Sequence, residues 1–159
     1  MIPSLDLSIE CDSWNTLSAL EALAGEVIAA CVTEAARPLP DKAEVSLLFC
    51  DDAAIRLLNK TWRGKDMPTN VLSFPVPARR GKAPSPMLGD IVIAYETTAG
   101  EAARDNKTLR SHTAHLIAHG FLHLTGFDHE NDADADAMES AERRILAALG
   151  IADPYLASA

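Results

Sequence analysis

The chain has 159 residues, and a single domain of this length can bury a sizeable hydrophobic core. The composition is 48% hydrophobic, and no apolar run approaches the length of a membrane-spanning helix, which excludes the class of helical membrane proteins. A net charge of −9 argues against a protein that binds polyanions through its overall charge. The amino-terminal residues lack the basic and apolar regions of a secretory signal, so we expect a cytoplasmic protein without a membrane partner.

The first third of the chain predicts two strands that flank a helix. Residues 3–10 alternate loosely between apolar and polar side chains, as in a strand. Asp12 or Ser13 is expected to cap an amphipathic helix of about five turns, which runs through Val32 and ends before a pair of prolines. Residues 45–49 form a short apolar run between polar residues and predict the second strand.

The middle of the chain predicts one helix and two more strands. Asp51 or Asp52 can cap the helix, and its apolar residues as far as Trp62 are expected to point inward. Residues 71–74 predict a third strand, and residues 88–94 are the clearest strand in the chain. Between these two strands, four prolines and a glycine predict an extended surface loop.

The last third of the chain predicts three helices in succession. The first covers residues 96–106, and the second begins after a cap at Thr108 and ends at Thr125. The third follows Asn131 or Asp132 and ends at a glycine. We therefore predict an α+β fold for residues 1–159, with a small mixed sheet of about four strands and about five helices in a single metal-dependent hydrolase domain.

Three histidines at metal-ligand spacing stand out in the second of these helices. His119 and His123 are four residues apart and share one helix face. Gly126 can end the helix in a left-handed turn, and such a turn can bring His129 back as a third ligand. Three imidazoles that leave a fourth position open describe a catalytic zinc site, so the sequence predicts one Zn²⁺ per chain.

This spacing is that of the metzincin proteases, with one difference. Those enzymes carry a general-base glutamate where this chain has Gly120, so the metzincin-like ligand set is present without the peptidase base. A lone histidine on an apolar helix is more often a hydrogen-bonded core residue than a ligand. About 12 Å of helix separates His115 from His123, so the two could not both reach one ion. We therefore expect His115 to be a core residue or to lie beside the ligands. His112 is expected to be solvated.

Basic residues are concentrated in one segment of this acidic chain. Between residues 56 and 82 the only acid is Asp66, and the segment holds half of the 14 lysines and arginines. The basic residues are Arg56, Lys60, Arg63, Lys65, Arg79, Arg80 and Lys82. Such a strip can attract phosphate, although a run of charge is more often a solvated face.

Three segments together resemble the YbeY family. Residues 119–129 are similar to the family signature His-Gly-x-Leu-His-Leu-x-Gly-Tyr/Phe-Asp-His. Residues 58–74, from Leu-Asn-x-x-Trp-Arg-Gly-Lys-Asp to Val-Leu-Ser-Phe, resemble its second motif, and residues 88–93, Leu-Gly-Asp-Ile-Val-Ile, its third. The resemblance extends from about residue 45 to residue 150. One difference is Asn70, where many members carry aspartate.

The resemblance implies a bacterial metal-dependent endoribonuclease that acts on single-stranded RNA, in 16S rRNA 3′-end maturation and ribosome quality control. It implies a zinc-like ion held by His119, His123 and His129, and a functional arginine at Arg63. The implied partners are RNA, ribosomal proteins and small GTPases of ribosome assembly.

The other candidate residues follow from their positions in the chain. The basic strip supplies the candidate substrate-binding residues, which are Lys65, Arg79, Arg80 and Lys82. Asp128 lies beside the third ligand, where it either orients an imidazole or caps the next helix.

Two other functions remain open from the residues alone. One is a metallopeptidase whose general base is displaced to Glu130 or Glu139. The other is a ribosome-associated binding module without catalytic activity, in which the metal only clamps the last helix. Removal of the metal distinguishes the second, since a structural ion contributes directly to folding.

Overall fold

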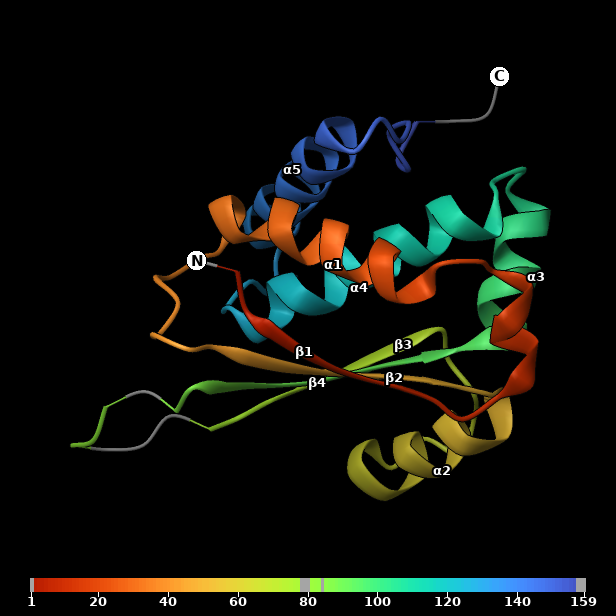
Figure 1. The fold of residues 1–159 in the computed structure, drawn as a ribbon, viewed down its shortest axis with the longest axis horizontal. Coiled ribbons are helices and arrows are strands. Elements are labelled where there is room, and N and C mark those ends of the chain that lie inside the picture. Colours follow the sequence, from red (N-terminus) through yellow and green to blue (C-terminus); the bar gives the residue numbers. More distant parts are fainter. Residues whose placement is uncertain (1, 78–80, 84, 157–159) are drawn as a thin grey trace.

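A mixed four-stranded sheet forms the centre of the fold, with helices on both of its faces (Figure 1). The computed structural model describes residues 2–77, 81–83 and 85–156. The strands are β1 (Ser4–Ile9), β2 (Glu44–Cys50), β3 (Val71–Pro75) and β4 (Met87–Ala94). Their order in the sheet is β1-β2-β4-β3; β2 is parallel to β1 and β4, and β3 is antiparallel to β4.

Helices cover the sheet because parallel neighbours need crossover connections. The α-helices are α1 (Leu20–Cys31), α2 (Asp52–Arg63), α3 (Tyr95–Arg104), α4 (Leu109–Leu124) and α5 (Asp132–Ala148). In Figure 1, α1, α4 and α5 lie on one side of the sheet and α2 on the other. This arrangement confirms the predicted α+β fold, with its four-stranded mixed sheet and five α-helices in the described residues.

The main core lies between the sheet and the helices α1 and α4. Leu47 on β2 and its neighbour Ile91 on β4 are fully buried in this layer, together with Ile117 and Phe121 of α4. Burial of an aliphatic side chain of this size contributes about 1.5–3 kcal/mol. Helix α4 is therefore fixed against the sheet along its inner face, and its opposite face can carry polar groups.

The first predicted helix is wrong in its amino-terminal half. Residues Asp12–Thr16 form a short 3₁₀ helix, and α1 begins only at Leu20, after Ala19 in a left-handed conformation with φ of 55°. Trp14 explains the break, because its indole is fully buried and its Nε1–H donates to the carbonyl of Cys50 at 2.9 Å. A continuous helix would not place this side chain in the core.

The prediction that Trp62 points inward is also wrong. Its side chain is 70% exposed and packs edge-on against Phe74, with ring centroids 6.5 Å apart. The second core, beneath α2, is small, and Ile55, Leu72 and Val92 fill it. Since β3 is the edge strand, no further sheet lies beyond Phe74 for the indole to cover.

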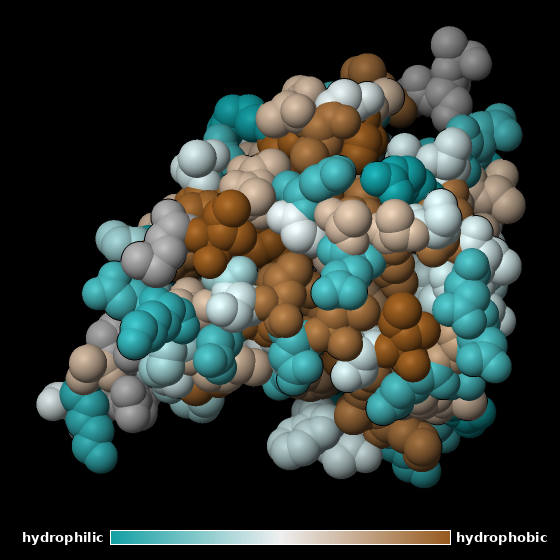
Figure 2. Space-filling model, viewed as in Figure 1, coloured by the Kyte–Doolittle hydropathy of each residue, from teal (hydrophilic) through white to brown (hydrophobic). Residues whose placement is uncertain are grey.

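No helix in the described ranges is long and apolar enough to cross a bilayer. On the face seen in Figure 2, hydrophobic residues are interrupted by hydrophilic ones.

Candidate metal centre

The end of α4 determines how the three histidines lie. Thr108 caps the start of the helix, where its hydroxyl accepts the Ser111 N–H at 3.0 Å. The last helical residue is Leu124, and Gly126 then takes a φ of 115°, which other residues rarely adopt. This turn reverses the chain and brings His129 back towards the helix.

The ligand atoms of His119, His123 and His129 all lie within 4.8 Å of one another. The Nε2 atoms of His119 and His123 are 3.2 Å apart. Two tetrahedral ligands about 2.1 Å from one ion are separated by about 3.4 Å, so the observed spacing suits a shared ion. Three imidazoles are a donor set that fits a divalent first-row metal.

Hydrogen bonds fix which nitrogen of each helical histidine faces the site. The Nδ1–H of His123 donates to the carbonyl of Phe127 at 3.0 Å, and the Nδ1–H of His119 donates to Glu142 at 3.1 Å. Both Nε2 lone pairs are then free for a metal. Burial and the neighbouring His119 lower the pKa of His123, which favours the neutral imidazole that a metal requires.

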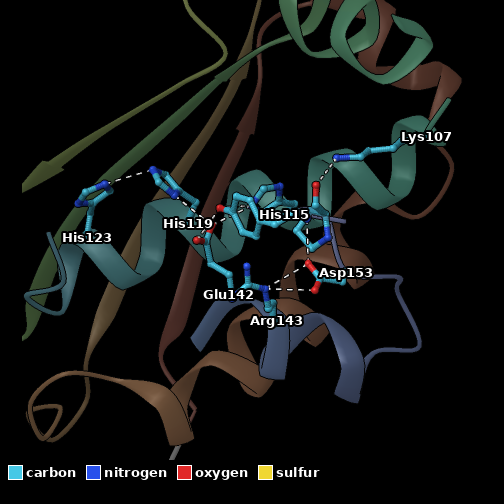
Figure 3. A network of polar contacts seen from close by, with 9 residues as sticks. Lys107, His115, His119, His123, Glu142, Arg143 and Asp153 are labelled. Atoms are coloured by element: carbon cyan, nitrogen blue, oxygen red, sulfur yellow. Dashed lines mark hydrogen bonds and ion pairs between the residues drawn. The ribbon is translucent and has the colours of Figure 1, made fainter. Parts of the chain in front are cut away.

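Glu142 of α5 is a functional candidate that sequence reasoning missed. Its side chain is fully buried and accepts hydrogen bonds from His115 at 2.8 Å, His119 at 3.1 Å and the hydroxyl of Tyr155 at 2.8 Å (Figure 3). Burial raises the pKa of this carboxyl, but the histidine hydrogen bonds outweigh burial and lower the pKa to about 2. An ionised Glu142 can therefore accept the Nδ1–H of His119 and orient its ring.

The other predicted neighbours of the ligands behave differently from one another. His115 lies beside the site and contacts Glu142. Asp128 accepts the backbone N–H of His129 at 2.7 Å. The residue that caps α5 is Asn131 rather than Asp128. The expectation of a solvated His112 is wrong, since it is 6% exposed and bonds Glu101 at 2.9 Å.

A cleft of about 580 Å³ opens over the histidines. Arg63, the last residue of α2, lines this cleft together with Arg37, which the sequence analysis did not single out. Gly64 ends α2 with a φ of 70°, and the chain turns sharply after Arg63. The acidic residues Asp128 and Glu130 also line the cleft.

The basic strip does not form one continuous surface in the described residues. Arg56 pairs with Asp66 at 2.8 Å, and Lys65 is exposed but does not line the cleft. Lys82 lines a second cavity that adjoins the cleft. Arg79 and Arg80 lie outside the described residues.

Gly120 faces the sheet. A Cβ at this position would lie 2.8 Å from the Ile91 side chain and 3.2 Å from the hydroxyl of Ser73. The Ser73 hydroxyl also donates to the Gly120 carbonyl at 3.3 Å. The absence of a side chain therefore allows α4 to approach β3 and β4 closely, and a glutamate here would require the helix to shift.

Asn70 shapes the wall of the cleft next to β3. Its side-chain oxygen accepts the Val71 N–H at 2.6 Å, and its amide donates to Glu101 at 2.9 Å. An aspartate at this position would place two carboxylates in contact. The Asn70 amide suits the Glu101 neighbour that this chain carries.

Residues 8–150 match the family model described as Endoribonuclease YbeY. A protein of Methylocella silvestris named Endoribonuclease YbeY is 52% identical over 98% of this chain and 87% of its own length. A protein of the same name from Azorhizobium caulinodans is 48% identical over 95% of each chain. The solution structure of a Thermotoga maritima protein matches the fold with a TM-score of 0.56 at 20% identity, over 96% of this chain and 99% of the other. The chain belongs to the YbeY endoribonuclease family.

Proposed function

We propose that this chain is a metal-dependent endoribonuclease that cleaves single-stranded RNA. The observation that carries the proposal is the open three-histidine cluster beside Arg63 in one cleft. Relatives named Endoribonuclease YbeY, at 52% and 48% identity, support the same activity. Maturation of the 16S rRNA 3′ end and ribosome quality control are the biological roles we infer.

Zn²⁺ is the ion we propose, one per chain, held by His119, His123 and His129. Imidazole ligands with an open position suit this metal in hydrolytic sites. When bound, the ion supplies Lewis-acid activation of the phosphate and of water.

The residues of the chain contribute position and charge. Glu142 and the Phe127 carbonyl hold two imidazoles in the orientation that a ligand needs. The Arg63 guanidinium can bind two phosphate oxygens, and it can stabilise the charge that develops on them during cleavage. The described residues show no ion pair for Arg63, so its charge remains available.

The inferred partners are RNA, ribosomal proteins and small GTPases of ribosome assembly, in the cytoplasm. We retain Lys65, Arg79, Arg80 and Lys82 as the proposed contacts to RNA phosphates outside the reacting position. Contacts of this kind act through counterion release and therefore weaken with salt.

A metallopeptidase is less well supported. The position of the peptidase base is Gly120, where a side chain would meet Ile91 and Ser73. Of the two displaced bases considered, Glu130 lines the cleft and Glu139 does not.

Metal analysis combined with RNA and peptide cleavage assays on one purified sample tests the proposal. We expect one equivalent of zinc and cleavage of single-stranded RNA, both lost in His123→Ala. Peptide cleavage without RNA cleavage would reject the ribonuclease assignment.

A further inference from the structure

A second cavity continues from the metal cleft along the carboxyl end of α4. The two cavities share Arg37 as a lining residue. On one wall, Gly126 lines the cleft and the preceding residue, Thr125, lines the second cavity. On the other wall, Pro75 lines the cleft and the next residue, Val76, lines the second cavity. Because both walls pass from one cavity to the other through adjacent residues, the two cavities form one path.

The second cavity is small, and most of its described lining is apolar. Its volume is about 200 Å³, and residues 38–40 line it together with Val76 and Met87. The charged residues among its described lining are Arg37 and Lys82, without an aspartate or glutamate. On a protein of net charge −9, such a surface is electrostatically suited to a phosphate with an adjoining base.

Arg37 stands at the junction, held near the end of α4. Its Nη2 donates to the carbonyl of Leu124 at 3.4 Å, and the preceding Ala36 N–H donates to the Thr125 hydroxyl at 3.4 Å. The nearby carboxylate of Glu34 is already bound by Arg144 at 2.7 Å. The described residues contain no ion pair to Arg37, and its side chain is exposed.

Gly126 lies next to Arg37. A Cβ at this position would lie 3.7 Å from the Ala36 side chain and 4.0 Å from Nε of Arg37. The residue that ends the metal-binding helix therefore also borders the passage to the second cavity.

We propose that Arg37 and this cavity form a nucleotide subsite, in which Arg37 binds an RNA phosphate next to the reacting one and the apolar wall receives the adjoining base. The inference rests on the proposed ribonuclease function. Arg63 serves the reacting phosphate, whereas Arg37 serves its neighbour, so the single strand runs over the metal and past the end of α4. A cation that contacts a neighbouring phosphate affects substrate affinity more than turnover.

Salt dependence of RNA cleavage by the metal-loaded protein tests the subsite. For Arg37→Gln we expect the slope of log kcat/KM against log salt to fall by about 0.7, the value for one phosphate contact on a single strand. Turnover at saturating RNA should remain within about twofold of wild type. Arg37→Lys should retain the slope, because it keeps the charge. Arg104→Gln, which removes an exposed arginine of α3, is the matched control and should behave as wild type.

A scan with RNA oligonucleotides that carry one neutral methylphosphonate linkage locates the contact. When the neutral linkage replaces the contacted phosphate next to the scissile bond, Arg37→Gln and the wild type should cleave the oligonucleotide equally well. Equal slopes for Arg37→Gln and Arg104→Gln would overturn the subsite, as would a loss of turnover with an unchanged KM. If the wild type cleaves no RNA, the proposed function fails instead. The salt dependence of RNA binding is then measured in place of cleavage, and a slope for Arg37→Gln equal to that of the wild type would still overturn the subsite.

Discussion

At the residue scale, the sequence predicts the three-histidine cluster and misses the carboxylate that orients it. The spacing of His119, His123 and His129 is local along the chain, so the helix and the turn at Gly126 bring these residues together. Glu142 reaches the site through the packing of α5 on α4, which no local pattern gives. Its one signal is its position, since a carboxylate lies on the apolar stripe that Met138 and Ile145 define.

Glu142→Gln tests the orientation of His119. The amide keeps the shape of the side chain but loses the charge that holds the Nδ1–H of His119. We expect metal affinity to fall about 10–100-fold, measured by competition with a chelator. Glu139→Gln removes a carboxylate three residues earlier on the same helix and should leave the affinity unchanged. Wild-type affinity in Glu142→Gln would show that the hydrogen bond does not tune the ligand.

Arg63→Ala separates catalysis from binding. Loss of a positioned cation at a developing negative charge reduces turnover by about 10²-fold or more. The variant should keep its metal, because Arg63 contacts no histidine in the described structure. Steady-state kinetics check this expectation. A raised KM with unchanged maximal rate would make Arg63 a binding residue.

At the element scale, the strands and most helix boundaries follow from the sequence. Strand β4 contains the apolar run of residues 91–94, and the caps at Thr108 and Asn131 form as predicted. The failures occur where tertiary packing outweighs local pattern. Burial of Trp14 breaks the first helix, and the sheet edge leaves Trp62 exposed. Both outcomes depend on neighbours distant in sequence.

Gly120→Ala tests the contact between α4 and the sheet. The new methyl group would lie 2.8 Å from Ile91, and overpacking of this kind costs about 1–3 kcal/mol. Gly100→Ala is the matched control, since this helical glycine of α3 has open space around its Cβ position and should gain about 1 kcal/mol. Denaturant unfolding of the two variants isolates the packing effect. Equal free energies of unfolding would contradict the close approach.

At the scale of the whole molecule, the three-histidine cluster lies outside the main core. The buried layer between the sheet and α4 includes Leu47, Ile91 and Ile117, whereas His129 is exposed. An ion at the histidines would bridge α4 and the loop before α5, but it would not replace any of this apolar burial. The fold therefore has its own source of stability.

Removal of the metal should leave the protein folded. Chelation removes only the binding contribution, about 4 kcal/mol when the free ion is 1,000 times its Kd, and lowers Tm accordingly. We expect an unchanged far-UV circular dichroism spectrum at 25 °C and full recovery of Tm when zinc returns. His123→Ala should melt near the Tm of the chelated wild type and should not respond to zinc. Cooperative unfolding at 25 °C on chelation would instead identify a structural ion that clamps α5, and would support the non-catalytic binding module.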